Sequence, residues 1–319
     1  MGNTSLTGIV VPVVTPLVEG EYVDVSALGA EVDRLVAAGV HGIFVLGSTG
    51  EFPALREGEK ERAIRAAVEA AGGRVPVLAG ATEPGTERAV AWAKAAAQLG
   101  ADAVVVAPPY YYRMDRRALL RHFSAVAKAS PIPLVLYNYP QTTGNVIDVE
   151  TVSELAHAAL VIGIKDSGGD LIYLQSLTSR MPESCTRLIG HEGLAAAALL
   201  CGYATGVVPA MAAVVPELFV SLWEAYRRSD VQAVRRLQAE IDRWIALYSL
   251  GPVPVVVKAC LWLLGRLQSP LATLPLGQLD VQLVERLREW LDSHGLPVRE
   301  REEVERWFGT LSTYTRTWE

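Results

Sequence analysis

The sequence predicts an α/β fold in which a (β/α)8 barrel carries a C-terminal helical appendix. Eight short apolar runs alternate with eight longer helical segments as far as residue 228, and only helical periodicity follows. The apolar runs lack polar/apolar alternation, which is typical of parallel strands covered on both faces. Eight such units with right-handed crossovers close naturally into a barrel. An open doubly wound sheet is the alternative, but the G-x-G-x-x-G turn that usually follows its first strand is absent.

The expected strands are short, rich in β-branched residues and followed by glycine, proline or polar residues. They cover residues 8–16, 41–46, 75–81, 103–107, 133–137, 161–165, 187–190 and 206–210. The helices between them show apolar residues at helical spacing and end at glycine or before proline. Asp24 or Ser26 caps the first helix, which ends at residue 38. The later helices cover residues 57–71, 84–99, 115–129, 149–158, 171–180, 194–200 and 216–228.

The chain after residue 229 predicts helices only, at residues 231–250, 253–267 and 279–294. We therefore divide it into a barrel (1–230), a C-terminal helical subdomain (231–296) and a tail extension (297–319). The tail is charged and then aromatic. It either packs a last helix, residues 300–308, on a neighbour or is a partly disordered end.

The composition excludes several classes of protein. A net charge of −6 without a basic patch argues against a nucleic-acid partner. Cys185, Cys201 and Cys260 show no metal or disulfide spacing, and an odd number of cysteines suits a reducing cytoplasm. The polar N-terminus does not resemble a secretory signal, and no apolar run reaches the ~18 residues of a membrane span.

Lys165 is the residue around which the chemistry is organised. It ends the apolar run that begins at Val161, and Asp166 and Ser167 follow it directly. A barrel presents catalytic groups at the carboxyl ends of its strands, and burial lowers the pKa of a lysine and frees its amine to attack a carbonyl. The sequence therefore predicts a Schiff-base lysine. A lysine that only extends from the strand end to solvent is an equally open alternative.

Other strand ends carry further candidates. Ser48 and Thr49, between Gly47 and Gly50, form a cradle for a carboxylate, or else cap the next helix. Tyr137 closes the fifth strand and is either a proton relay or a core tyrosine with a polar tip. Three adjacent tyrosines, Tyr110 to Tyr112, cannot all face one pocket, and we expect some at a subunit interface.

The loop after the seventh strand contains His191 and Glu192, which are candidates for contacts to polar substrate groups or for a helix N-cap. They are adjacent, and no other cluster in the sequence has metal-ligand spacing. We therefore expect no metal.

The motifs G-S-T-G-E, Y-N-x-P and G-I-K-D, in this order, resemble those of the dihydrodipicolinate synthase/N-acetylneuraminate lyase family as far as about residue 291. The resemblance implies a cofactor-free class I aldolase or lyase and a homotetramer built as a dimer of dimers. It implies that Lys165 forms a Schiff base with pyruvate or another 2-oxo acid and that Tyr137 shuttles the proton. Ser48 and Thr49 would hold the carboxylate.

The same resemblance implies further site residues. Thr49 would link Tyr137 to Tyr111 of an adjacent subunit, and Gly190 and Val208 would line the pocket. Ser167, Glu192 and Thr142 are candidates for contacting the aldehyde.

Departures from the family pattern limit which substrates we expect. Dihydrodipicolinate synthases have an arginine at the position of Thr142, where it holds the carboxylate of the aldehyde. A threonine cannot replace the two parallel hydrogen bonds of a guanidinium group. Neuraminate lyases carry an acidic residue at His191. The form Tyr137-Asn138-Tyr139-Pro140 looks more like that of 2-keto-3-deoxy sugar-acid aldolases. We expect such a substrate. The alternatives are dihydrodipicolinate synthesis or a 2-oxo acid dehydratase on the same site, and a non-catalytic barrel that binds a sugar acid.

Overall fold

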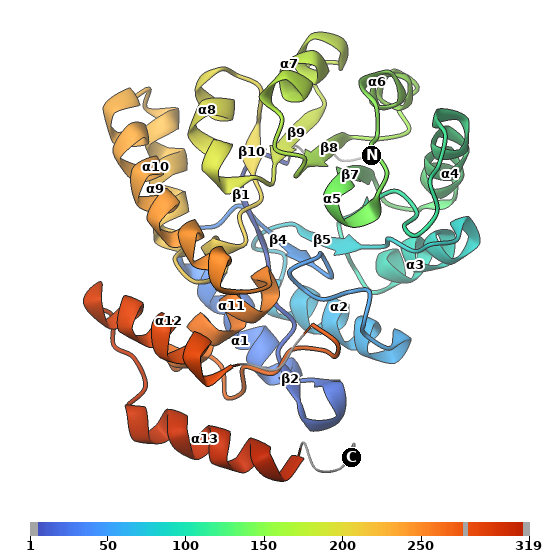
Figure 1. The fold of residues 1–319 in the computed structure, drawn as a ribbon. Helices are drawn as coiled ribbons and strands as arrows, with labels where there is room; N and C mark the ends of the chain where they lie inside the picture. The colour runs from blue at the N-terminus through green and yellow to red at the C-terminus, as the bar shows by residue number, and fades with distance from the viewer. Residues whose placement is uncertain (1–5, 277–279, 315–319) are drawn as a thin grey trace.

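Eight parallel strands form a closed barrel surrounded by helices (Figure 1). The computed structural model describes residues 6–276 and 280–314. The barrel strands are β1 (Gly8–Pro12), β4 (Gly42–Val45), β5 (Val77–Gly80), β6 (Ala103–Val106), β7 (Leu134–Asn138), β8 (Gly163–Asp166), β9 (Thr186–Ile189) and β10 (Gly206–Val207). Their order around the barrel is β1-β10-β9-β8-β7-β6-β5-β4. The predicted (β/α)8 barrel is confirmed, and the doubly wound alternative is wrong.

The helices that cover the barrel lie close to their predicted positions, except that a short helix, α5, forms where the sequence predicts a polar loop. They are α1 (Val25–Ala37), α2 (Glu57–Ala71), α3 (Thr86–Gln98), α4 (Arg116–Ala129), α5 (Pro140–Thr143), α6 (Val149–His157), α7 (Leu171–Arg180), α8 (Ala195–Leu200) and α9 (Pro216–Arg227). Asp24, Asp115, Asp148 and Asp170 each accept a hydrogen bond from a backbone N–H in the first turn of the helix that follows. Such capping sets where these helices begin.

The strands bury side chains on both faces. Val10, Phe44 and Val135 belong to a cluster inside the barrel, whereas Ile9 and Ile164 belong to the larger core under the helices. Successive side chains of a strand point to opposite faces. Since Ile164 faces outward, the next residue, Lys165, points inward. Lys165 therefore lies inside the barrel, near its carboxyl-terminal mouth.

Short elements before α1 and after β10 were not predicted. The first strand stops at Pro12 instead of residue 16, and the chain then forms a hairpin of β2 (Leu17–Val18) and β3 (Tyr22–Val23) around the 3-10 turn η1 (Glu19–Glu21). The last strand ends at Val207 instead of residue 210, because the backbone turns into η3 (Met211–Ala213) soon after Val208 N–H bonds to Ile189 O.

The C-terminal helices are α10 (Val231–Ile245), continued by η4 (Ala246–Leu250), α11 (Val253–Leu263) and α12 (Val281–Ser293). The predicted start of the last of these, residue 279, lies outside the described residues. Figure 1 shows α10 beside α9, and α12 beyond α11 at the outer edge. One continuous core contains Phe219 of the barrel as well as Trp244 and Leu261 of the appendix. The division at residue 230 stays a prediction.

The described part of the tail forms a helix, α13 (Arg301–Tyr314), which is longer than the predicted 300–308. It packs on its own chain: Val304 is buried, and the rings of Trp307 and Trp262 of α11 lie 5.1 Å apart. Packing of this helix on a neighbouring copy stays a prediction.

The described residues contain no single helix that is long and apolar enough to cross a membrane. The helical segments Val231–Leu250 and Val253–Leu263 reach that length and hydropathy only when they are taken together, and their axes are bent by 109° relative to each other. The second of these helices is buried from Val255 to Leu263 inside the protein.

Candidate active site

Lys165 lies at the carboxyl end of β8, where its side chain is 5% exposed. Its Nζ lies 4.1 Å from the ring centroid of Tyr137 and 5.0 Å from that of Phe44. Burial lowers the pKa of Lys165 to about 7, against the opposing effect of the Glu192 carboxylate. A substantial part of this amine is therefore neutral at physiological pH, which is the form that attacks a carbonyl.

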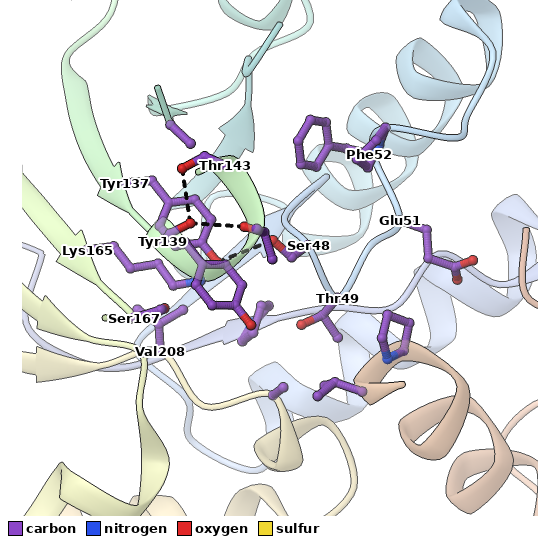
Figure 2. Close-up of a pocket in the computed structure, with 18 of the residues that line it drawn as sticks. Ser48, Thr49, Glu51, Phe52, Tyr137, Tyr139, Thr143, Lys165, Ser167 and Val208 are labelled. Atoms are coloured by element: carbon purple, nitrogen blue, oxygen red, sulfur yellow. Dashed lines mark hydrogen bonds between the residues drawn. The ribbon is translucent and has the colours of Figure 1, made fainter. Parts of the chain in front are cut away.

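Tyr137 is the register partner of Lys165 on the neighbouring strand β7. The Tyr137 hydroxyl lies 3.3 Å from Ser48 Oγ, and its ring stacks on Tyr139 with centroids 5.8 Å apart (Figure 2). Burial raises the pKa of Tyr137, while the hydroxyls of Ser48 and Ser167 oppose the shift. The phenol is therefore protonated at neutral pH and able to donate a proton.

The segment 47–51 after β4 holds Ser48 and Thr49 in two overlapping turns. Gly50 N–H bonds to Gly47 O at 3.0 Å, and Glu51 N–H bonds to Ser48 O at 3.1 Å. Both hydroxyl residues line the same cavity as Lys165. Within the single chain, the hydroxyl that lies next to the phenol of Tyr137 is that of Ser48. The relay through Thr49 that the family resemblance implies stays a prediction.

The cavity at the barrel mouth has a volume of about 980 Å³. The structure brings nearly all of the predicted site residues together around it. Those that line it are Ser48, Thr49, Tyr137, Thr142, Lys165, Ser167, Gly190, Glu192 and Val208.

Tyr111 is the predicted site residue that does not reach this cavity within the single chain. Its side chain is 87% exposed, its backbone φ is 86°, and its ring contacts Tyr112. Tyr110, the preceding residue, lines the cavity instead. The predicted role of Tyr111 requires a second copy of the chain and stays a prediction.

Glu192 is held by the protein rather than left free for a substrate. Its Oε1 accepts a hydrogen bond from Met211 N–H at 2.8 Å. The Tyr248 hydroxyl lies 3.1 Å from both carboxylate oxygens and donates to them. Burial raises the pKa of Glu192 to about 7, with these donors opposing the shift. Its nearness to Lys165 couples the ionisation of the two groups.

The two remaining candidates for aldehyde contacts differ in position. The Ser167 backbone N–H bonds to Asn138 O at 2.9 Å, and its side chain faces Gly190 across the gap between β8 and β9. Thr142 is exposed, and its hydroxyl donates to Tyr139 O at 3.1 Å. Its oxygen still has capacity to accept a hydrogen bond.

Sequence reasoning missed the outer wall of the cavity. The side chains there come from the segment after Glu51 and from the C-terminal helices and loop: Phe52, Pro53, Ile245, Tyr248, Val253, Pro254, Leu274, Pro275 and Leu276. These residues sit in ordinary apolar helical or loop patterns. Their place at the barrel mouth follows from tertiary packing, which no local signal reveals.

The part of the chain that the structure describes contains no group of three or more His, Cys, Asp or Glu side chains that could hold a metal ion. The cavity is lined by an amine, Lys165, a phenol, Tyr137, and the hydroxyls of Ser48 and Thr49.

The sequence profile of the dihydrodipicolinate synthetase family matches residues 5–294. The chain belongs to this family. An uncharacterized DapA-like lyase of Halobacterium salinarum is 41% identical over 275 residues, which are 86% of this chain and 90% of the relative. A 4-hydroxy-tetrahydrodipicolinate synthase of Methanoculleus marisnigri is 35% identical over 291 residues, 90% of this chain and 99% of the relative.

The family likeness extends to three dimensions. A prophage protein of the dihydrodipicolinic acid synthase family from E. coli K12, solved in complex with pyruvate, superimposes with a TM-score of 0.87 at 31% identity. The match covers 91% of this chain and 99% of that one. The protein is thus a lyase of the family of pyruvate-dependent class I aldolases.

Proposed function

We propose that the protein cleaves or forms a carbon–carbon bond between pyruvate and an aldehyde through a Schiff base on Lys165. The observation that carries this proposal is the position of a buried amine, with its pKa lowered to about 7, over the ring of a protonated tyrosine at the barrel mouth. A non-catalytic sugar-acid binder would have no use for such an amine.

In the cleavage direction, Ser48 and Thr49 hold the carboxylate of a 2-oxo acid, and neutral Lys165 attacks its C2 carbonyl. The carbinolamine loses water when Tyr137 donates its proton to the departing hydroxyl, which leaves an iminium and a phenolate. The phenolate then takes the proton of the C4 hydroxyl as the C3–C4 bond breaks into the iminium. An aldehyde and an enamine result, and protonation of the enamine at C3 followed by hydrolysis releases pyruvate. Through Ser48, whose Oγ lies 3.3 Å from the Tyr137 hydroxyl, the adjacent Thr49 and Tyr111 of a neighbouring copy connect the phenol to solvent.

For the acceptor we propose an aldehyde derived from a 2-keto-3-deoxy sugar acid, with Ser167 and Thr142 as the contacts to its hydroxyls. Glu192, whose carboxylate is bound by Met211 and Tyr248, would act on this part of the substrate mainly through its charge. Lys165 is the sole lysine or arginine among the described residues that line the cavity. The carboxylate of an aldehyde such as the one used in dihydrodipicolinate synthesis therefore finds no second lysine or arginine among these residues. Because synthases are among the relatives, that reaction and dehydration are the alternatives, and product analysis with a panel of 2-oxo acids and aldehydes separates all three.

The decisive experiment is reductive trapping. Incubation with pyruvate and cyanoborohydride should add one reduced pyruvate to the peptide that contains Lys165, as seen by mass spectrometry. The Lys165→Met variant should remain unlabelled, while Lys94→Met, which removes a surface lysine of α3, should label like the wild type. A wild-type protein without the adduct, or with the adduct on another lysine, rejects the mechanism.

We further infer a homotetramer, a dimer of dimers, in the cytoplasm. The exposed tyrosine pair Tyr111 and Tyr112 supports an interface next to the cavity, since tyrosine is enriched at such surfaces. All three cysteines are free thiols, which suits a reducing compartment. Sedimentation of the purified protein tests the assembly.

A further inference from the structure

Glu51, the last residue of the segment 47–51, has a role that the proposed chemistry does not explain. Figure 2 shows its side chain turned away from Lys165. The carboxylate is buried with a side-chain exposure of 0% and forms an ion pair with Lys258 of α11, whose side chain is equally inaccessible. Its Oε2 also accepts hydrogen bonds from Thr273, at 2.6 Å from the backbone N–H and 2.8 Å from the hydroxyl.

These contacts join parts of the chain that are far apart in sequence, since Glu51 and Thr273 are 222 residues apart. Lys258 continues the connection, because its Nζ donates to Leu271 O at 2.8 Å. Leu274 N–H is held in turn by Glu21 Oε1 of η1 at 2.7 Å. The segment 271–276 is therefore anchored at three successive points, and its residues Leu274 to Leu276 form part of the outer cavity wall.

Glu51 is equally firmly connected to the residues that would bind the carboxylate. Its backbone N–H bonds to Ser48 O, and the preceding carbonyl, Gly50 O, accepts from the Thr15 hydroxyl at 2.7 Å. Glu51 itself has a φ of 60°, in the left-handed region that a non-glycine residue adopts only where its surroundings hold it. A change at the carboxylate is therefore transmitted to the turn that presents Ser48 and Thr49.

We propose that Glu51 is a positioning residue that couples the segment 47–51 to the outer cavity wall 271–276. This inference rests on the proposed function for its kinetic consequence: the wall over the aldehyde side and the cradle for the 2-oxo acid are held in place by one buried carboxylate. Disturbing the wall then weakens the binding of pyruvate at the opposite side of the cavity.

The test uses the full-length protein with Thr273→Val, which removes the hydroxyl donor to Glu51 but keeps the shape of the side chain and the backbone N–H. Thr273→Ser restores the hydroxyl. Glu31→Gln is the control, because Glu31 is a buried carboxylate like Glu51, is paired with Arg34 and does not line the cavity.

The first measurement is hydrogen exchange, which needs no substrate. In Thr273→Val, amides of the segment 47–51 should lose protection together with those of 271–276, and neither Thr273→Ser nor Glu31→Gln should show this paired loss. A loss confined to 271–276 would overturn the coupling and leave Glu51 as a purely structural residue.

The second measurement is the rate of pyruvate trapping on Lys165. Thr273→Val should raise the half-saturating pyruvate concentration about tenfold, the effect of weakening one hydrogen bond to a charged group. The trapping rate at saturation should stay close to that of the wild type, and Thr273→Ser should recover the affinity. An unchanged pyruvate affinity contradicts the inference. A wild type that is never trapped rejects the proposed function instead, and the exchange result still decides the coupling.

Discussion

Lys165 has an amine whose charge state is set by its surroundings. Burial lowers its pKa to about 7, so acid keeps it protonated and unable to attack. We predict that the rate of pyruvate trapping falls about tenfold per pH unit below this value and levels off above it. Trapping rates between about pH 5.5 and pH 9 provide the measurement. A trapping rate that still rises about tenfold per pH unit at pH 9 would show that the amine is solvated and titrates near the ordinary lysine value.

Glu192 acts on that midpoint through its charge, because the carboxylate raises the pKa of Lys165. Replacing Glu192 with glutamine removes this charge, so the midpoint of the trapping profile should move to lower pH by up to about one unit. Glu240→Gln, at a partly exposed residue of α10 that pairs with Arg243, should leave the midpoint where it is. A midpoint that also stays in place in Glu192→Gln would mean that the two groups are not coupled.

At the scale of the elements, the close approach of β8 and β9 shapes the site. A Cβ on Gly190 would lie 2.1 Å from Ser167 Oγ and 3.0 Å from Lys165 Cε. Gly190→Ala should therefore displace the hydroxyl, press on the lysine and slow pyruvate trapping, with a loss in the free energy of unfolding of about 1–3 kcal/mol.

The control for this prediction is Gly58→Ala in α2, where a Cβ meets nothing within 4 Å. That substitution should raise the free energy of unfolding by about 0.5–1 kcal/mol and leave trapping unchanged. Chemical denaturation and trapping kinetics on both variants give the comparison. Normal trapping in Gly190→Ala would show that the strands can move apart.

The elements also show where prediction from sequence succeeds and fails. Buried parallel strands produce continuous apolar runs, so β4 to β8 and the strand-end residues Ser48, Tyr137 and Lys165 could be located. The hairpin of β2 and β3 has two residues per strand, too few for any periodicity. Lys258 was missed because it follows a bend of 109° between two helical segments of the appendix, an angle that local sequence does not encode. Tyr248 precedes that bend, and its contact with Glu192, 56 residues away in the sequence, arises from tertiary packing.

For the whole molecule, the position of Tyr111 predicts a site shared between two copies. It is exposed in the single chain, while Lys165 is buried in the barrel. Lys165→Ala and Tyr111→Phe should each reduce turnover. Mixing the two variants under conditions that exchange subunits should restore activity, because one of the two sites in a hybrid dimer then receives an intact lysine and an intact tyrosine.

Activity assays before and after subunit exchange provide the measurement, with Tyr112→Phe in place of Tyr111→Phe as the control variant. Tyr112 also lies at the surface, and its variant should be active without mixing. A hybrid that stays inactive would place both residues in the same subunit's site or remove Tyr111 from the reaction.

The aromatic contacts of the appendix have an optical consequence. Five of the seven tryptophans follow residue 230, and two pairs of indoles lie in contact there: Trp262 with Trp307, and Trp244 with Trp290. Intrinsic fluorescence therefore reports mainly on the C-terminal helices rather than on the barrel itself. Emission and circular dichroism recorded during one denaturation will reveal whether the two parts of the protein melt together.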